Sequence, residues 1–196
     1  LTAILATHHH GDHVGGLEWL AGRWKCPVFG PAGEKIDGLT TRLREGDAVL
    51  AVLARSTRAR RGFFTTFGAA YTSRFIDVPA STGYGEPIQR LFKLRDGERI
   101  VDALSLDPRA GEIAAKHEGD PPPVHAVAVS SDGYALRFGL EGLVEPSTRA
   151  GRRFARPAKD AAITGVARYT GSETLIAATS EGRGILAKGA EVNYLS

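Results

Sequence analysis

Residues 63–72 read Phe-Phe-Thr-Thr-Phe-Gly-Ala-Ala-Tyr-Thr, so that two short runs of aromatic, apolar and β-branched residues flank a turn at Gly68. The pattern returns twice, because Ser131-Asp132-Gly133 and Ser180-Glu181-Gly182 also follow one apolar run and precede another. Runs of this kind separated by glycine turns are typical of consecutive strands. The sequence therefore predicts a mainly β fold from about residue 46 onwards.

Fixed spacings around the three glycines indicate an internal repeat. An apolar residue stands ten positions after each glycine: Val78, Leu143 and Val192. A closing strand pattern also recurs, at residues 46–50, 97–101 and 159–163. Val49 and Ile163 each precede the next turn glycine by 19 positions, whereas Ile100 precedes Gly133 by 33. The excess coincides with residues 107–123, which hold a run of three prolines and which we expect to form an inserted, exposed loop.

A repeat of about 50 residues with about four strands is typical of propeller-like blades. The alternative is a set of unrelated β-hairpins, but three agreeing offsets favour the repeat. We therefore expect one blade represented only by its closing strand near Val49, two nearly complete blades, and a third truncated after residues 192–196. The predicted domains are residues 1–48 and residues 49–196.

The N-terminal part carries a different signal, the cluster His8-x-His10-x-Asp12-His13 behind an apolar run over residues 1–6. The run predicts a buried strand, and residues 17–21 predict a short helix after the cluster. Imidazole and carboxylate suit zinc, iron or manganese. His8 and His10 can face one ion and Asp12 and His13 a second, which would activate a bridging water. The alternatives are a remnant of a purification tag and a chance surface cluster of histidines.

Residues 1–48 resemble the metallo-β-lactamase superfamily, and within it the hydroxyacylglutathione hydrolases (glyoxalase II). The segments that carry this resemblance are residues 7–17, 27–32 and 43–47. It implies an α/β fragment of that fold, His8 and His10 on one metal, Asp12 and His13 on the other, and a glutathione thioester as substrate. The family also uses two later histidines and a bridging aspartate. Only His117 and His125 follow His13, in dissimilar segments, so we expect an incomplete two-metal site and assign no catalytic residue.

Most of the remaining chain resembles the C-terminal domain of the DNA gyrase A subunit and of its topoisomerase IV counterpart. The matching segments are residues 63–68, 77–85, 91–99, 133–138, 151–156 and 191–196. The resemblance implies a β-pinwheel that bends DNA around its rim, with double-stranded DNA and other topoisomerase subunits as partners. The nearest analogue of a gyrase box is the degenerate segment 149–153, so we expect weak bending. The cleavage domain is absent, so no tyrosine inherits its role: Tyr71, Tyr84, Tyr134, Tyr169 and Tyr194.

The basic residues give this part a modest positive charge. Residues 1–48 hold five Lys and Arg against six Asp and Glu, whereas residues 49–196 hold twenty against sixteen. The candidate DNA-binding residues form two clusters in turn-like segments, together with one further arginine: Arg55, Arg58, Arg60 and Arg61; Arg149, Arg152, Arg153, Arg156 and Lys159; and Arg137. Arginine and lysine bind phosphates without reading bases. The alternative is an ordinary solvated surface.

Composition limits the class of protein. The 196 residues are 42% apolar and 24% charged, as in soluble globular proteins, and no apolar run approaches a membrane span. The single Cys26 excludes an internal disulfide, is expected to be packed, and suits a reducing, cytoplasmic location. The chain has no Met, which suggests a fragment. The leading hypothesis is a DNA-binding pinwheel fragment. The alternatives are a metal-dependent thioester hydrolase and a chimeric chain without an evolved function.

Overall fold

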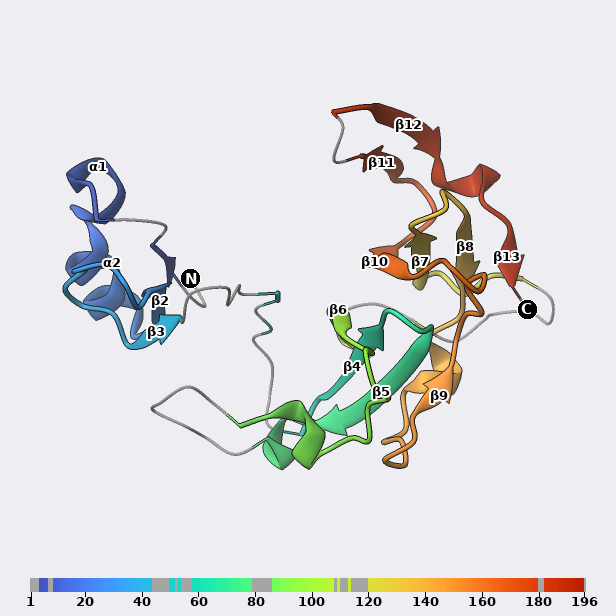
Figure 1. Ribbon diagram of the computed structural model, residues 1–196, viewed down its shortest axis with the longest axis horizontal. Coiled ribbons are helices and arrows are strands. Elements are labelled where there is room, and N and C mark those ends of the chain that lie inside the picture. Colours follow the sequence, from blue (N-terminus) through green and yellow to red (C-terminus); the bar gives the residue numbers. More distant parts are fainter. Residues whose placement is uncertain are drawn as a thin grey trace. The chain divides into compact units, whose positions relative to one another are not determined.

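The computed structural model describes residues 4–6, 9–43, 50–51, 53, 58–78, 86–107, 109, 113, 120–179 and 182–195. The chain forms two compact units (Figure 1). Unit 1 comprises Leu1–Ala54 and Val78–Ile88, and unit 2 comprises Arg55–Asp77 and Gln89–Ser196. The predicted domain boundary at residues 48 and 49 lies outside the described residues.

Unit 1 contains a three-stranded parallel sheet in the order β1-β2-β3. Its elements in chain order are β1 (Ile4–Leu5), α1 (Gly11–Val14), α2 (Leu17–Trp24), β2 (Val28–Pro31) and β3 (Thr41–Leu43). Parallel neighbours need a crossover, and the two helices supply the one between β1 and β2. The predicted helix is confirmed and extends three residues beyond the predicted Ala21, and the predicted strand is confirmed at Ile4 and Leu5. The expectation that this strand is buried is wrong at Leu5, which is 54% exposed.

A small apolar core holds unit 1 together. Val28 and Ile36 are almost fully buried, and Leu17 of α2 packs with them, as does Ala6 directly after β1. The Thr40 hydroxyl accepts a hydrogen bond from the Val28 N–H (2.8 Å) and donates one to the Val28 carbonyl (3.0 Å). These contacts fix the strand that follows α2. Cys26 is buried, as expected for a packed residue.

Unit 2 is built from antiparallel hairpins and short 3-10 helices. Its strands are β4 (Arg60–Thr65), β5 (Ala69–Arg74), β6 (Ile100–Ser105), β7 (His125–Ser130), β8 (Ala135–Phe138), β9 (Arg152–Arg153), β10 (Ile163–Tyr169), β11 (Thr174–Ala178), β12 (Gly184–Lys188) and β13 (Tyr194–Leu195). The 3-10 helices are η1 (Phe75–Asp77), η2 (Ile88–Arg90), which begins one residue before unit 2 resumes, η4 (Glu141–Leu143) and η5 (Gly189–Glu191). Blade 1 has the strand order β6-β4-β5-β9, blade 2 has the order β10-β7-β8-β13, and β11 pairs with β12.

The turns between the paired strands confirm the internal repeat. Gly68, Gly133 and Gly182 have φ angles of 74°, 84° and 80°, a region that glycine enters without steric cost. Each glycine N–H donates to the carbonyl three residues earlier, over 3.1, 3.0 and 3.0 Å. The glycines of three hairpins, β4–β5, β7–β8 and β11–β12, therefore share one backbone conformation and one hydrogen bond.

The closing strands repeat as well. Thr66 N–H donates to Arg99 O (2.9 Å), and Arg99 N–H donates to the Thr66 hydroxyl (3.1 Å). Ser131 and Ala162 form the same pair of hydrogen bonds, at 2.8 and 3.1 Å. These contacts align β6 and β10 on their hairpins. The strands begin at Ile100 and Ile163, within the predicted closing segments.

Each blade takes its outer strand from beyond the next hairpin. β9 follows β7 and β8 in the sequence but pairs with β5, and β13 follows β11 and β12 but pairs with β8. β9 is antiparallel to its neighbour and β13 is parallel to its neighbour, so the two exchanges differ in direction. The exchange interlocks consecutive blades of unit 2.

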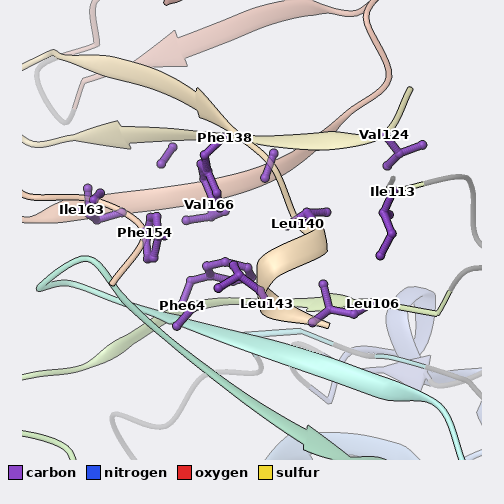
Figure 2. Close-up of a cluster of buried hydrophobic side chains, with 14 residues drawn as sticks. Phe64, Leu106, Ile113, Val124, Phe138, Leu140, Leu143, Phe154, Ile163 and Val166 are labelled. Atoms are coloured by element: carbon purple, nitrogen blue, oxygen red, sulfur yellow. The ribbon is translucent and has the colours of Figure 1, made fainter. Parts of the chain in front are cut away.

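The core of unit 2 lies between blade 1 and blade 2. Figure 2 shows side chains from both sheets filling the space between them. The ring of Phe64 in β4 lies edge-on to Phe138 of β8 and to Phe154, with centroids 6.0 and 5.2 Å apart. Phe138 and Phe154 stack at 4.8 Å. Burial of these large apolar surfaces is the main stabilising contribution to the unit.

The predicted inserted loop is only partly described. Its described residues include Asp107, Ile113 and Pro122, and all three are buried. The expectation of an exposed loop is therefore wrong at these positions, because Ile113 joins the core between the blades. His117 and the intervening residues 114–119 lie outside the described residues.

No helix within the described ranges is long and apolar enough to cross a membrane.

Candidate functional site

The predicted metal loop connects β1 to the helices of unit 1. His10 stands at the N-cap of α1, with φ −66° and ψ 142°, and its carbonyl accepts the Val14 N–H at 3.1 Å. A side chain at Gly15 would lie 2.7 Å from the Gly11 carbonyl oxygen, which explains why the loop needs glycine there. His8 and the side chains of Asp12 and His13 lie outside the described residues. The structure therefore describes the side chain of one predicted ligand, His10.

His9, which sequence reasoning did not select, has a defined partner. Both its backbone N–H and its Nδ1 lie within hydrogen-bond distance of Glu34 Oε2, at 2.6 and 2.7 Å. A carboxylate only accepts, so Nδ1 carries the proton. The His9 and His10 rings meet edge-on, with centroids 5.0 Å apart. Glu34 thus holds the loop through two hydrogen bonds to His9. The two residues are 25 positions apart, and no sequence pattern predicted their contact.

The donors that the structure describes do not assemble into a metal site. Among the residues that the structure describes, no three His, Cys, Asp or Glu side chains lie close enough together to hold an ion. A zinc, iron or manganese centre needs three or four such groups. His10 is the one member of the predicted ligand set whose side chain the structure describes, and a single imidazole is fewer groups than a metal centre needs.

The first basic cluster lies only partly in a turn, the part that contains Arg58. Arg60 and Arg61 belong to β4, where they pair with Arg74 and Ser73 of β5, so the prediction of a turn-like segment is wrong here. Arg60 forms an ion pair with Glu145 (3.1 Å). Arg58 is exposed, and Arg55 lies outside the described residues.

Arg61 faces two aromatic rings. Its guanidinium lies 5.1 Å from the centre of the Phe63 ring and 4.8 Å from that of Phe75. Burial lowers the pKa of Arg61, while the charge of Asp77 opposes that shift. Such a guanidinium is positioned by cation–π contacts within unit 2. It therefore contributes to packing on β4 more directly than to an outer surface.

Two further candidates hold backbone carbonyls. Arg152 of β9 donates to Glu145 O (2.6 Å) and to Pro146 O (3.3 Å). Arg137 of β8 donates through Nε to Val192 O (2.7 Å) and through Nη2 to Ala190 O (3.3 Å). Arg152 and Arg153 form a short strand, so the second cluster is also only partly turn-like. Arg137 thus binds the segment that leads to the exchanged strand β13, and Arg152 binds the segment that leads to β9.

The remaining predicted side chains face outward. Arg149, Arg153, Arg156 and Lys159 are exposed, and they form no ion pair with any residue that the structure describes. Arg149 donates one hydrogen bond to Gln89 O (3.3 Å). Arg156 lines a cavity of about 400 Å³ beside blade 2. These four cations lie within residues 149–159, on the connection that contains β9 and leads to β10.

Known proteins match this chain in two ways, one by sequence and one by fold. The model of the metallo-beta-lactamase superfamily matches residues 1–134, more than half of the chain. The chain belongs to the metallo-beta-lactamase superfamily. The superfamily match continues past the predicted boundary at residue 48, through the hairpin β4–β5 and up to the turn between β7 and β8.

Curated relatives from this superfamily include hydroxyacylglutathione hydrolases. The enzyme of Nitrosomonas europaea is 54% identical over 48 residues, which are 24% of this chain and 18% of that protein. The enzyme of Thiobacillus denitrificans is 42% identical over 126 residues, which are 60% of this chain and 48% of that protein. The chain thus spans between about a fifth and a half of the length of these superfamily members.

A solved structure resembles the fold of the β-rich part. The C-terminal domain of E. coli ParC has a TM-score of 0.59 and 21% identity, and the match covers 83% of this chain and 61% of that one. At this identity the likeness is one of fold. One chain therefore combines a sequence of the metallo-beta-lactamase superfamily with a mainly β fold, and the structural neighbours of that fold are β-pinwheel domains. Both resemblances predicted from the sequence are confirmed.

Proposed function

We propose that unit 2 binds double-stranded DNA through the phosphate backbone, without base recognition, and bends it weakly. The observation that carries the proposal is the set of exposed, unpaired cations at Arg149, Arg153, Arg156 and Lys159 in the described part of unit 2. Each can contact a phosphate without first breaking an ion pair. Phosphate contacts give affinity and position but little sequence information.

The fold supports the same proposal. One solved neighbour is the C-terminal domain of DNA topoisomerase IV, matched with a TM-score of 0.58 and 16% identity over 74% of this chain and 42% of that one. By this likeness we also propose other topoisomerase subunits as protein partners. A DNA-binding role agrees with the cytoplasmic location expected from the single cysteine.

Titration of a labelled duplex with the full chain tests the proposal. We expect log Kd to change linearly with log salt between about 50 and 200 mM, with a slope to which each phosphate contact adds about 0.9, and these four cations together about 3.6. Arg153→Gln should lower the slope by about 0.9, whereas Lys35→Gln, an exposed charge change in unit 1, should leave it unchanged. Undetectable binding at low salt, or binding that ignores salt, would remove the proposal.

A second candidate function is metal-dependent hydrolysis of a glutathione thioester, which membership of the superfamily favours. We test it by metal analysis of the zinc-loaded full chain and by thioester hydrolysis. If this function is correct, the chain should bind close to two ions, as in a two-metal site. His10→Ala should lose both bound metal and hydrolytic activity. A chain that binds no zinc, iron or manganese excludes this function and leaves the DNA proposal untouched.

A further inference from the structure

The backbone of Lys93 is fixed from both sides, while its side chain is exposed. Its N–H donates to Arg149 O (2.7 Å), and its carbonyl accepts the Tyr71 hydroxyl (3.3 Å). The preceding residue, Phe92, is 3% exposed and packs on Tyr71 with ring centroids 5.0 Å apart. An ordered backbone reduces the entropy that the ammonium loses on binding an anion. Lys93 was absent from the residues predicted from sequence.

Arg149 is held at the same place. Gly151, two residues later, has φ +71°, and a side chain there would lie 2.7 Å from the Tyr71 ring. The turn that carries Arg149 therefore lies directly over the buried Tyr71. The guanidinium donates to Gln89 O (3.3 Å), on the segment that leads to Lys93. Two cations that are 56 positions apart in sequence thus emerge from adjacent, anchored backbones.

The acidic group beneath this place points inward. Glu98 is 7% exposed, and its carboxylate accepts the Thr65 hydroxyl (2.6 Å) and the Arg95 N–H (2.8 Å). Neither Lys93 nor Arg149 forms an ion pair with a residue that the structure describes. Both charges therefore remain available to an external anion.

We propose that Lys93 and Arg149 together form a phosphate-binding point of unit 2. The inference rests on the proposed DNA-binding function and deepens it by naming a contact. The guanidinium offers a planar fork of donors, and the ammonium offers a compact charge, so the pair can engage adjacent phosphates of one strand. By contrast, Arg60 and Arg152 are engaged by Glu145 and Pro146 and position the edge of blade 1.

The test compares two double variants of the full chain that remove the same charge. Lys93→Gln/Arg149→Gln removes the proposed point, and Arg183→Gln/Lys188→Gln removes two exposed cations around β12. Duplex binding is measured at several salt concentrations after circular dichroism and thermal melting have shown that each variant is folded. We expect the salt slope to fall by about 1.8 in the first variant, because each lost phosphate contact removes about 0.9. The control should keep the original slope.

Equal losses in both variants would overturn the inference, because they would indicate a general charge effect. An unchanged slope in Lys93→Gln/Arg149→Gln, with loss in Arg153→Gln, would also overturn it while DNA binding itself stands. Absence of binding by the unaltered chain would remove the proposed function and this inference together. The single variant Lys93→Gln extends the test, since the exposed Lys93 side chain forms no hydrogen bond or ion pair with a described residue and its replacement should leave the fold intact.

Discussion

Thr72 and Leu143, 71 residues apart in the sequence, are joined by a hydrogen bond from the Thr72 hydroxyl to the Leu143 carbonyl (2.7 Å). Arg137 and Val192 repeat the relationship, with Arg137 Nε donating to Val192 O at 2.7 Å. Thr72 and Arg137 each stand four positions after a turn glycine, and Leu143 and Val192 each stand ten positions after the next one. In both blades, therefore, a side chain of the second hairpin strand donates a hydrogen bond to a backbone carbonyl of the next repeat.

Replacing Thr72 by valine should destabilise unit 2. The two side chains have similar shapes, but Thr72 is 1% exposed, so Thr72→Val leaves the Leu143 carbonyl buried without its donor. Such a loss costs about 1–3 kcal/mol in free energy of unfolding. The free energies of unfolding are compared by urea denaturation, monitored by far-UV circular dichroism. Thr164→Val is the control, because its exposed hydroxyl donates to Val129 O and water can replace it. Equal costs for the two variants would contradict the assignment.

The sequence predicted the repeat because its signals are local. Gly68, Gly133 and Gly182 are needed for a positive φ, and each lies between apolar runs, so the hairpins could be predicted. The exchanged strands β9 and β13 could not, because two-residue strands have no periodicity and their partners are distant in sequence. The same limit applies to the candidate sites. Charge alone could not separate the carbonyl-bound Arg152 from the exposed Arg153, nor show the contact of His9 with Glu34.

Two equivalent glycines should respond differently to alanine. Gly133→Ala meets nothing within 4 Å, so it should cost only the strain of a left-handed backbone, about 1–2 kcal/mol. A Cβ at Gly68 would collide with the Ala155 carbonyl, whose carbon would lie 2.8 Å away. Gly68→Ala should therefore cost about 1–3 kcal/mol more. Urea denaturation of both variants measures the difference, and a smaller cost at Gly68 would show that its turn does not pack on Ala155.

Truncating Phe64 should produce the largest loss among these variants. Its ring is fully buried and contacts Phe138 and Phe154, so Phe64→Ala leaves a cavity between blade 1 and blade 2. Replacing a buried phenylalanine by alanine costs about 3–5 kcal/mol. Thermal melting and urea denaturation test this value. Tyr134→Ala is the control, because Tyr134 is 76% exposed and its loss should change stability by less than about 0.5 kcal/mol.

Mild acid should destabilise unit 2 through His125. The ring is 2% exposed, Nδ1 donates to Pro122 O (2.9 Å), and Nε2 is buried without a partner among the described residues. Burial lowers the pKa of His125 below 6.5; Arg137 acts in the same direction, whereas the Pro122 carbonyl and Glu173 oppose it. The unfolded chain therefore binds the proton more readily. The stabilising contribution is complete above about pH 6.5 and is lost as pH falls toward the folded pKa.

The variant His125→Phe separates this titration from other acid effects. A phenyl ring can keep the edge-on contacts with Tyr169 and Tyr194, whose ring centroids lie 5.1 and 5.6 Å from that of His125. The variant lacks the hydrogen bond to Pro122, so its Tm at neutral pH should be lower than that of the unaltered chain. Because a phenyl ring does not titrate, this Tm should vary less between about pH 7.5 and 5. Glu173, whose pKa is lowered to about 2, loses its contribution only below its usual value of 4.5, outside that range. Parallel decreases of Tm in both proteins would show that another group controls the acid response.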